Sequence, residues 1–266
     1  MPQTPDQWFA AVRGCERDGE LFRAYDLAMQ GLAVFPDDLR LKYRAVLCLA
    51  STGARKQAAQ LFDRLALDGH DDIRLTTSLG LDIAALRPRL LKDEALATHG
   101  NDRAPHFLAA ADAYAAVYQR ALAAGNPEAY YPGVNGATLY LLAGRAEQAS
   151  ALAREVLATF RAWPPGEKSY YEAVSELEAE LVLGDLAHAQ DNVRGVGAAI
   201  RESAERDYRG LAGTVRQLRL IVAAKGLDAD WLGELSPSPV IHFLGHIIAA
   251  PGQRGRFPAD PAAAAQ

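Results

Sequence analysis

The fold is decided by residues 45–62, whose sequence is AVLCLASTGARKQAAQLF. Apolar residues recur every three or four positions on both sides of Gly53, which is typical of two amphipathic helices joined by a turn. Ala45 and Ala58 lie where two such helices would cross, and small side chains there let the backbones approach closely. A large side chain such as Phe62 would fill the space toward a neighbouring hairpin. The stretch therefore predicts a helical hairpin with its turn at Gly53.

The same pattern recurs along the chain. Gly19 lies 34 residues before Gly53, and the same offsets hold around Gly144 and, in part, around Gly184. A period of 34 residues is that of the tetratricopeptide repeat, in which each hairpin stacks on the next to cover its apolar face. We therefore predict an all-α, tetratricopeptide-like α-solenoid of about five helical hairpins over residues 1–235.

Composition excludes several classes of protein. The 266 residues are 50% hydrophobic and carry a net charge of −5, which argues against a dedicated nucleic-acid binder. Met1–Asp6 lack the basic and apolar regions of a signal peptide, so we do not expect these residues to be one, and no apolar run approaches the ~18 residues of a membrane helix. Cys15 and Cys48 have apolar neighbours, so we interpret them as small core residues rather than as a disulfide. We expect a cytoplasmic protein with no membrane contact.

The character of the chain changes after residue 235. Ser236–Pro239 reads as a linker, and Val240–Ile248 is rich in β-branched residues, which favours a short strand. From Pro251 onward Pro, Gly, Arg and Ala dominate, so we expect a poorly ordered tail. We therefore predict a second segment, 236–266, that is a linker, a short non-helical extension and a disordered tail.

The sequence contains no catalytic constellation, so we predict that the chain is not an enzyme and has no cofactor. His242 and His246 have a spacing that can hold a metal on a helix, but no further ligand is near, and we predict no metal site. Acidic residues gather in one predicted helix, and we interpret them as a solvated or charge-paired face rather than an acid–base pair. They are Glu172, Glu176, Glu178 and Glu180.

Two groups of residues are candidates for a binding site. Tyr130 and Tyr131 precede Pro132, where a helix would begin, and Asn135 follows one turn later. Either these residues simply pack, or Tyr131 and Asn135 offer a stacking surface and hydrogen bonds beside a helix N-terminus that attracts anions. A late helix carries three arginines, which form either a solubilising outer face or the basic wall of a concave groove. They are Arg209, Arg216 and Arg219.

The stretch from Ala129 to Leu139 resembles a motif of the TRAF-binding, tetratricopeptide-like regulatory region of the apoptosis signal-regulating kinases and of bacterial signalling proteins. Leu90–Asp93 and Arg216–Leu220 are weaker matches. The resemblance covers roughly residues 20–225, and the chain departs from it at Pro88, where it implies a continuous helix. It implies a non-catalytic module that controls an effector in stress or defence settings.

The segment Pro239–His246 resembles the first strand of a Rossmann-like domain that follows this module in longer relatives. The resemblance thus implies that residues 236–266 are the start of a truncated following domain, or that the effector is a separate protein. We expect a regulatory or sensor module that binds a protein partner, or an attached effector domain, in its concave groove. The alternative is a sensor for a small nucleotide-like or phosphate-bearing ligand near the Tyr-Tyr-Pro-Gly motif.

Overall fold

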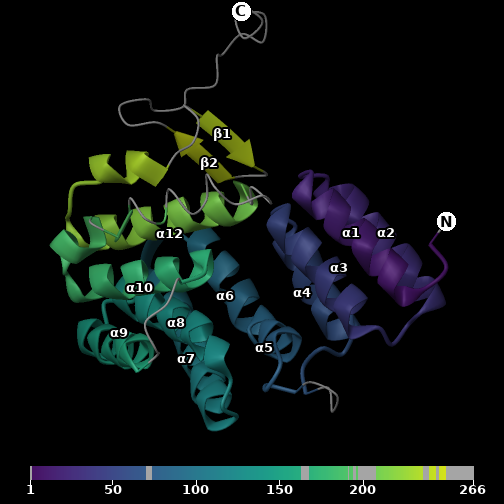
Figure 1. Cartoon of the computed structure of the whole chain (residues 1–266), viewed down its shortest axis with the longest axis horizontal. Coiled ribbons are helices and arrows are strands. Elements are labelled where there is room, and N and C mark those ends of the chain that lie inside the picture. Colours follow the sequence, from purple (N-terminus) through teal and green to yellow (C-terminus); the bar gives the residue numbers. More distant parts are fainter. Residues whose placement is uncertain are drawn as a thin grey trace, which may run out of the picture.

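The computed structural model describes residues 2–69, 74–162, 168–190, 192–193, 196, 208–235, 240–243 and 246–249. Its first half begins with two helical hairpins (Figure 1). They consist of α1 (Pro5–Arg17), α2 (Leu21–Val34), α3 (Leu39–Ser51) and α4 (Arg55–Arg64). Local sequence fixes their ends. Thr4 forms a capping box with Gln7 at the start of α1, and Asp38 accepts hydrogen bonds from the first amides of α3.

The turns confirm the repeat pattern. Gly19, Gly53, Gly144 and Gly184 all have positive φ, at 79°, 82°, 73° and 90°. A residue with a side chain is strained in this left-handed conformation, so glycine is the residue that closes each turn. Helices that follow one another pack as antiparallel pairs, and the prediction of an all-α tetratricopeptide-like solenoid is confirmed.

The middle of the chain contains α5 (Ser78–Ala84) and α6 (Leu86–Ala97), which are separated by Ala85. Pro88 lies in the first turn of α6, where a missing amide proton costs little. The departure from a continuous helix that Pro88 suggested is therefore a real break, located just before it. The remaining helices lie on the other side of this break. They are η1 (Gly100–Asp102), α7 (Arg103–Ala123), η2 (Pro127–Ala129), α8 (Tyr130–Leu142), α9 (Ala146–Arg161), α10 (Tyr170–Leu183), α12 (Tyr208–Lys225) and η3 (Asp230–Leu235).

Two short strands follow the helices, whereas the sequence predicted a single strand in this segment. β1 (Val240–Phe243) and β2 (His246–Ala249) form an antiparallel pair in which Val240 faces Ala249. The pair lies beside α12 (Figure 1). His242 and His246 are on separate strands, so the helical metal-binding spacing does not apply to them. The rest of the segment 236–266 lies outside the described residues, and its boundary at residue 235 stays a prediction.

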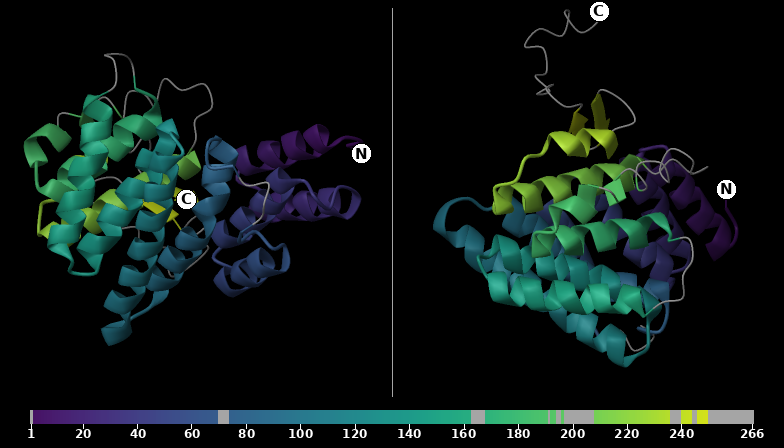
Figure 2. Two further views of the ribbon diagram at one scale, coloured as in Figure 1. Left: turned by 90° about the horizontal axis from the view of Figure 1, so that it is seen from below. Right: turned by 60° about the vertical axis from the view of Figure 1, so that its left-hand side comes forward.

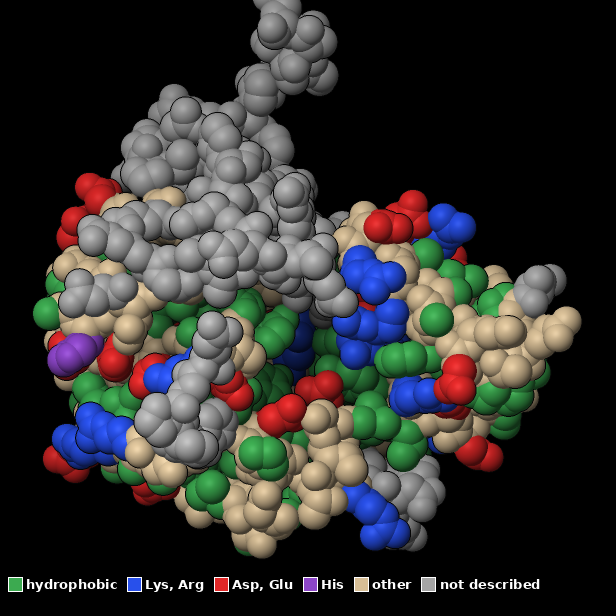
Figure 3. Space-filling view, in the orientation of Figure 1, with side chains coloured by type: hydrophobic (Ala, Val, Ile, Leu, Met, Phe, Trp, Pro, Cys, Tyr) green, Lys and Arg blue, Asp and Glu red, His purple; other side chains and the backbone are tan. Residues whose placement is uncertain are grey.

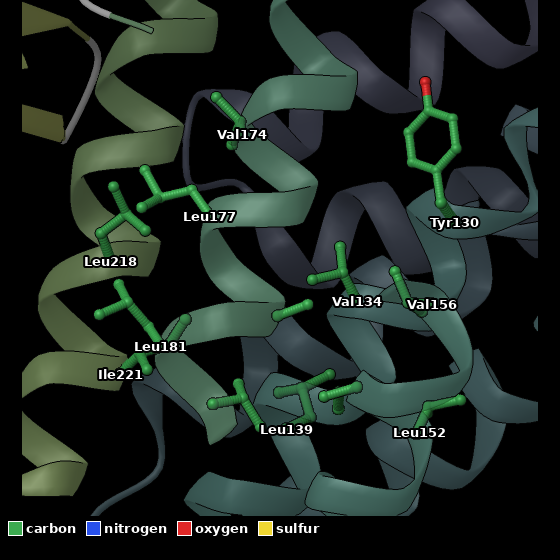
Figure 4. Close-up of a cluster of buried hydrophobic side chains, with 14 of the residues drawn as sticks. Tyr130, Val134, Leu139, Leu152, Val156, Val174, Leu177, Leu181, Leu218 and Ile221 are labelled. Carbon is green, nitrogen blue, oxygen red and sulfur yellow. The ribbon is translucent and has the colours of Figure 1, made fainter. Parts of the chain in front are cut away.

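The buried apolar side chains that the structure describes form two separate clusters. One runs from Trp8 to Leu90 and fills the N-terminal lobe, α1–α4; it includes both cysteines, which are buried and unbridged as predicted. The other runs from Leu81 to Leu235 and fills the C-terminal lobe, α7–α12. Figure 4 shows part of the second cluster, where Leu177 on α10 lies beside Leu218 on α12.

Only α5 and α6 contribute to both clusters among the described residues. Ile83 and Leu86 belong to the N-terminal cluster, whereas Leu81 and Ala95 belong to the C-terminal one. The two lobes are visibly distinct in Figure 2, where α1–α4 project from the larger body of helices. No helix in the described part of the chain is long and apolar enough to cross a membrane.

Candidate functional site

A cavity of about 510 Å³ lies between the two lobes. We call it the central cavity. Figure 3 shows the hollow between the lobes, with Lys and Arg side chains gathered at its mouth and in its depth. Of the side chains that the structure describes, five basic ones line it, although the whole chain is acidic. They are Arg13, Arg44, Arg89, Lys92 and Arg216, which come from α1, α3, α6 and α12.

Helix α8 forms one wall of the central cavity. A Cβ on Gly133 would lie 2.7 Å from Val156 Cγ2 on α9 and 2.9 Å from Tyr118 Cδ2 on α7. Glycine at this position therefore lets α7 and α9 pack closely against α8. On the cavity side of α8, the ring of Tyr131 meets Tyr114 edge to face, with 6.4 Å between ring centroids. The Tyr-Tyr-Pro-Gly motif therefore serves packing on one face of α8 and lines the cavity on the other.

A buried network of polar side chains connects four helices at the cavity wall. Lys92 Nζ on α6 donates hydrogen bonds to Asn135 Oδ1 on α8, at 2.7 Å, and to Gln217 Oε1 on α12. Gln217 Nε2 donates in turn to Glu178 Oε2 on α10, at 2.9 Å. Asn135 Nδ2 donates to the backbone oxygen of Tyr131 at 3.0 Å. Each amide is thus held in one orientation by partners at both ends.

Burial controls the electrostatics of this network. It lowers the pKa of Lys92, and the nearby Arg216 lowers it further, while Glu178 opposes the shift. Burial also raises the pKa of Glu178, against the opposing effects of Lys92 and the hydrogen bond from Gln217. Both groups are therefore shifted toward their neutral forms, because the effect of burial outweighs the attraction between their charges.

Two arginines share one carboxylate on the same side of the cavity. Asp93 Oδ2 lies 3.8 Å from Arg89 Nε, and Asp93 Oδ1 lies 3.6 Å from Arg216. Both distances are longer than a direct charged hydrogen bond, and the Nε–H of Arg89 has no hydrogen-bond partner among the described residues. Arg89 and Arg216 together carry two positive charges, and Asp93 balances one of them.

Arg44 reaches the central cavity from the N-terminal lobe. Its NH1 lies 3.3 Å from Glu16 Oε2, and its guanidinium carbon lies 5.0 Å from the ring centroid of Tyr43. In the part of the chain that the structure describes, the Nε–H of Arg44 is also without a hydrogen-bond partner. Cationic groups of both lobes therefore face one cavity.

Acidic and aromatic groups lie on another part of the cavity wall. Asp82 on α5 and Glu128 on η2 line it with Tyr43. Burial raises the pKa of Asp82 to about 6; Arg44 opposes the shift, and the like charge of Glu128 reinforces it. The hydroxyl of Tyr43 lies near enough to this carboxylate to oppose the rise of its pKa as well. The cavity thus combines basic groups with a partly buried acceptor.

The predicted site residues are brought together only in part. Tyr130, Tyr131, Asn135 and Arg216 line the central cavity. Arg219 is exposed and is not part of the lining. The side chain of Arg209 lies outside the described residues, although its backbone is part of α12.

Sequence reasoning missed several residues of the cavity. Glu178 was interpreted as part of a solvated or charge-paired face, but only 5% of it is exposed and it accepts a hydrogen bond from Gln217. Its neighbours Val174 and Leu177 are buried, and this apolar spacing was a signal that Glu178 faces inward. Arg44 and Asp82 carried no comparable signal, because they belong to helices that are distant in sequence from α8.

Metal binding has no support in the described part of the chain, where no group of three or more His, Cys, Asp or Glu side chains could hold an ion. The side chains of His242 and His246 are not among those described. The arrangement of the central cavity, with guanidinium, ammonium and amide donors, is suited instead to binding an anion.

Comparisons with known proteins agree with the repeat architecture. Residues 20–140 match a family described as Tetratricopeptide Repeats-Sensor. The match supports a tetratricopeptide-like sensor domain, while the finer likeness to the TRAF-binding region of the kinases stays a prediction. A comparison with curated proteins and a comparison with solved structures gave no match. The part of the chain from α2 to most of α8, which supplies Arg44, Lys92 and Asn135, is therefore similar to a tetratricopeptide-repeat sensor.

Proposed function

We propose that this chain is a non-catalytic sensor module that binds a small phosphate-bearing ligand in the central cavity and thereby controls an effector. The similarity of residues 20–140 to sensor repeats supports the role of a sensor. The volume of about 510 Å³ lies in the usual range for small-molecule sites. The effector is either a protein partner or an attached domain.

One observation carries the proposal: Arg89 and Arg216 share Asp93 at 3.6–3.8 Å. Two guanidiniums on one carboxylate leave a positive charge that a phosphate would balance, since guanidinium and phosphate form paired hydrogen bonds. Lys92 adds an ammonium beside them, with two of its three N–H groups bonded to amide oxygens. Ligand binding would therefore replace weak internal contacts with strong ones.

A protein partner in the groove is the second candidate. It is favoured by Tyr171, which lines the cavity and remains 54% exposed despite its size. Exposed aromatic side chains at the rim of a groove are typical of protein interfaces. Such a partner would present an acidic side chain to the arginines of the cavity.

The test compares two arginines of the same helix. Arg216→Gln should raise the Kd of a phosphate ligand by about 10- to 150-fold, because a hydrogen bond to a charged group contributes about 1.5–3 kcal/mol. Arg219→Gln removes an equal charge from an exposed position three residues further along α12. It should change the Kd by no more than about twofold. Binding is measured by calorimetry with inorganic phosphate, pyrophosphate and small sugar phosphates.

The outcomes separate the two candidates. An acidic tetrapeptide is included as a probe for the second. If it binds and no phosphate compound does, the cavity belongs to a protein partner and the sensor proposal fails. An equal loss of affinity for the phosphate compounds in Arg216→Gln and in Arg219→Gln would show that binding depends on the overall charge of α12 and not on the central cavity.

A further inference from the structure

Asp82 lies in the wall of the central cavity and has no role in holding a phosphate. It is on α5, one of the two helices that contribute to both hydrophobic clusters. No hydrogen bond or ion pair joins its carboxylate to another side chain among the described residues, and Tyr43, Arg44 and Arg89 are the groups near enough to favour its ionised form. A carboxylate that is mostly removed from water without a direct ion pair destabilises the fold, so its presence at a cavity calls for a ligand group that pairs with it.

The arginines of the cavity do not supply that group. Arg44 lines the same cavity, but its ion pair is with Glu16. Arg89 lies within electrostatic reach of Asp82 but is paired with Asp93. Glu128, the other acid of this part of the wall, repels negative charge. This part of the cavity therefore favours hydrogen-bond donors, whereas the part near Arg216 favours an anion.

We infer, resting on the proposed function, that the ligand is a phosphate ester that carries adjacent hydroxyl groups, as a sugar phosphate does. Its phosphate is held by Arg89, Arg216 and Lys92. Two neighbouring hydroxyls donate hydrogen bonds to the two oxygens of Asp82, since an ionised carboxylate is purely an acceptor. This arrangement places the two chemically different ends of one small molecule against the two different parts of the wall.

An aromatic side chain of the cavity fits the same class of ligand. Tyr43, Tyr114 and Tyr131 all line the cavity, and of these Tyr131 is the one that is not fully buried. Its ring offers a flat apolar surface against which the carbon face of a sugar ring can pack, while the hydroxyls of the sugar remain available to Asp82. Arg44 is stacked near Tyr43, which fixes both side chains beside the acid.

The experiment uses a pair of probes that differ by one hydroxyl. Ribose 5-phosphate and 2-deoxyribose 5-phosphate are titrated into the full chain, and the ratio of their Kd values is measured. We expect ribose 5-phosphate to bind at least about tenfold more tightly, because a lost hydrogen bond to a charged acceptor costs about 1.5–3 kcal/mol. Asp82→Asn should reduce this ratio to about two or less. Asp102→Asn, an exposed acid outside the cavity, should leave the ratio unchanged.

Each outcome decides a different claim. If neither inorganic phosphate, pyrophosphate nor any phosphate ester binds, the proposed function itself fails. If phosphate compounds bind but the two sugars have equal affinity, the role of Asp82 is overturned and the phosphate site stands. Tighter binding of phosphoethanolamine than of ribose 5-phosphate would also overturn it, because Asp82 would then select an amine. Should Asp82→Asn fail to fold, the ratio for the unmodified chain alone still decides.

Discussion

Single residues of the central cavity carry charges that lower the stability of the fold. Burial raises the pKa of Asp82 to about 6 and shifts Lys92 and Glu178 toward their neutral forms. Strongly shifted groups concentrate at functional sites, where binding requires charges that packing alone would exclude. The cost of keeping them is measurable without any ligand.

The pH dependence of the free energy of unfolding tests whether the buried charge of Asp82 lowers stability. Its pKa of about 6 in the folded chain exceeds the ~3.9 of an unfolded aspartate, so folding favours the protonated acid. The stability that this group contributes below pH 4 is therefore lost as the pH rises through 6. Asp82→Asn should match the unmodified chain near pH 4 and exceed its free energy of unfolding by about 1–3 kcal/mol at pH 7.5. Urea titrations at both pH values measure the difference. A destabilised Asp82→Asn chain at pH 7.5 would contradict the assignment.

Among the helices, α8 is the element on which both packing and site depend. Its glycines face α7 and α9, with an added Cβ on Gly136 lying 2.9 Å from Leu152 Cδ2. Its opposite face presents Tyr131 and Asn135 to the central cavity. Close packing on one face thus fixes the position of the polar groups on the other.

A matched pair of glycine substitutions tests the packing of α8. Gly133→Ala should lower the free energy of unfolding by about 1–3 kcal/mol, because its Cβ would overlap Val156 and Tyr118. Gly14→Ala in α1 meets no atom within 4 Å and should raise stability by up to ~1 kcal/mol, since alanine favours helix. Both values come from denaturant unfolding. Equal effects of the two substitutions would mean that α8 packs less tightly than its contacts indicate.

The elements were predictable to different degrees. Gly53 and Gly144 marked their turns because a left-handed turn leaves a glycine at a fixed offset from apolar positions. The break at Ala85 was suggested by Pro88 but not located, since proline is tolerated in the first turn of a helix and does not say on which side the chain bends. Two strands formed where the composition favoured one, because the run from Val240 to Ile248 was interpreted as a single strand although it contains Gly245, a residue type that often marks a turn.

At the scale of the whole molecule, the central cavity assembles residues that no local pattern could associate. Arg44, Lys92 and Gln217 come from three helices spread over most of the chain. Repeat spacing predicts that hairpins stack, but the angle between successive hairpins depends on the shapes of many side chains at once. The sequence therefore offered the residues on α8 and Arg216 as candidates, and they line the cavity, but their role in binding stays a prediction and the residues of the facing wall could not be predicted.

The two hydrophobic clusters have a calorimetric consequence. Because Trp8 to Leu67 pack apart from the C-terminal cluster, and α5 and α6 alone belong to both clusters within the described part of the chain, the lobes have separate sources of cooperativity. Without ligand, the enthalpy measured by scanning calorimetry should exceed the van't Hoff enthalpy, as expected when a chain melts in more than one step. A ligand held by Asp82 on α5, Arg89 on α6 and Arg216 on α12 should bring the two enthalpies toward equality, because α12 and the helices shared by both clusters can then not separate without releasing it. A single two-state transition in the absence of ligand would instead show that α5 and α6 couple the two lobes so strongly that they unfold as one cooperative unit. The cavity would then be a fixed pocket inside that unit.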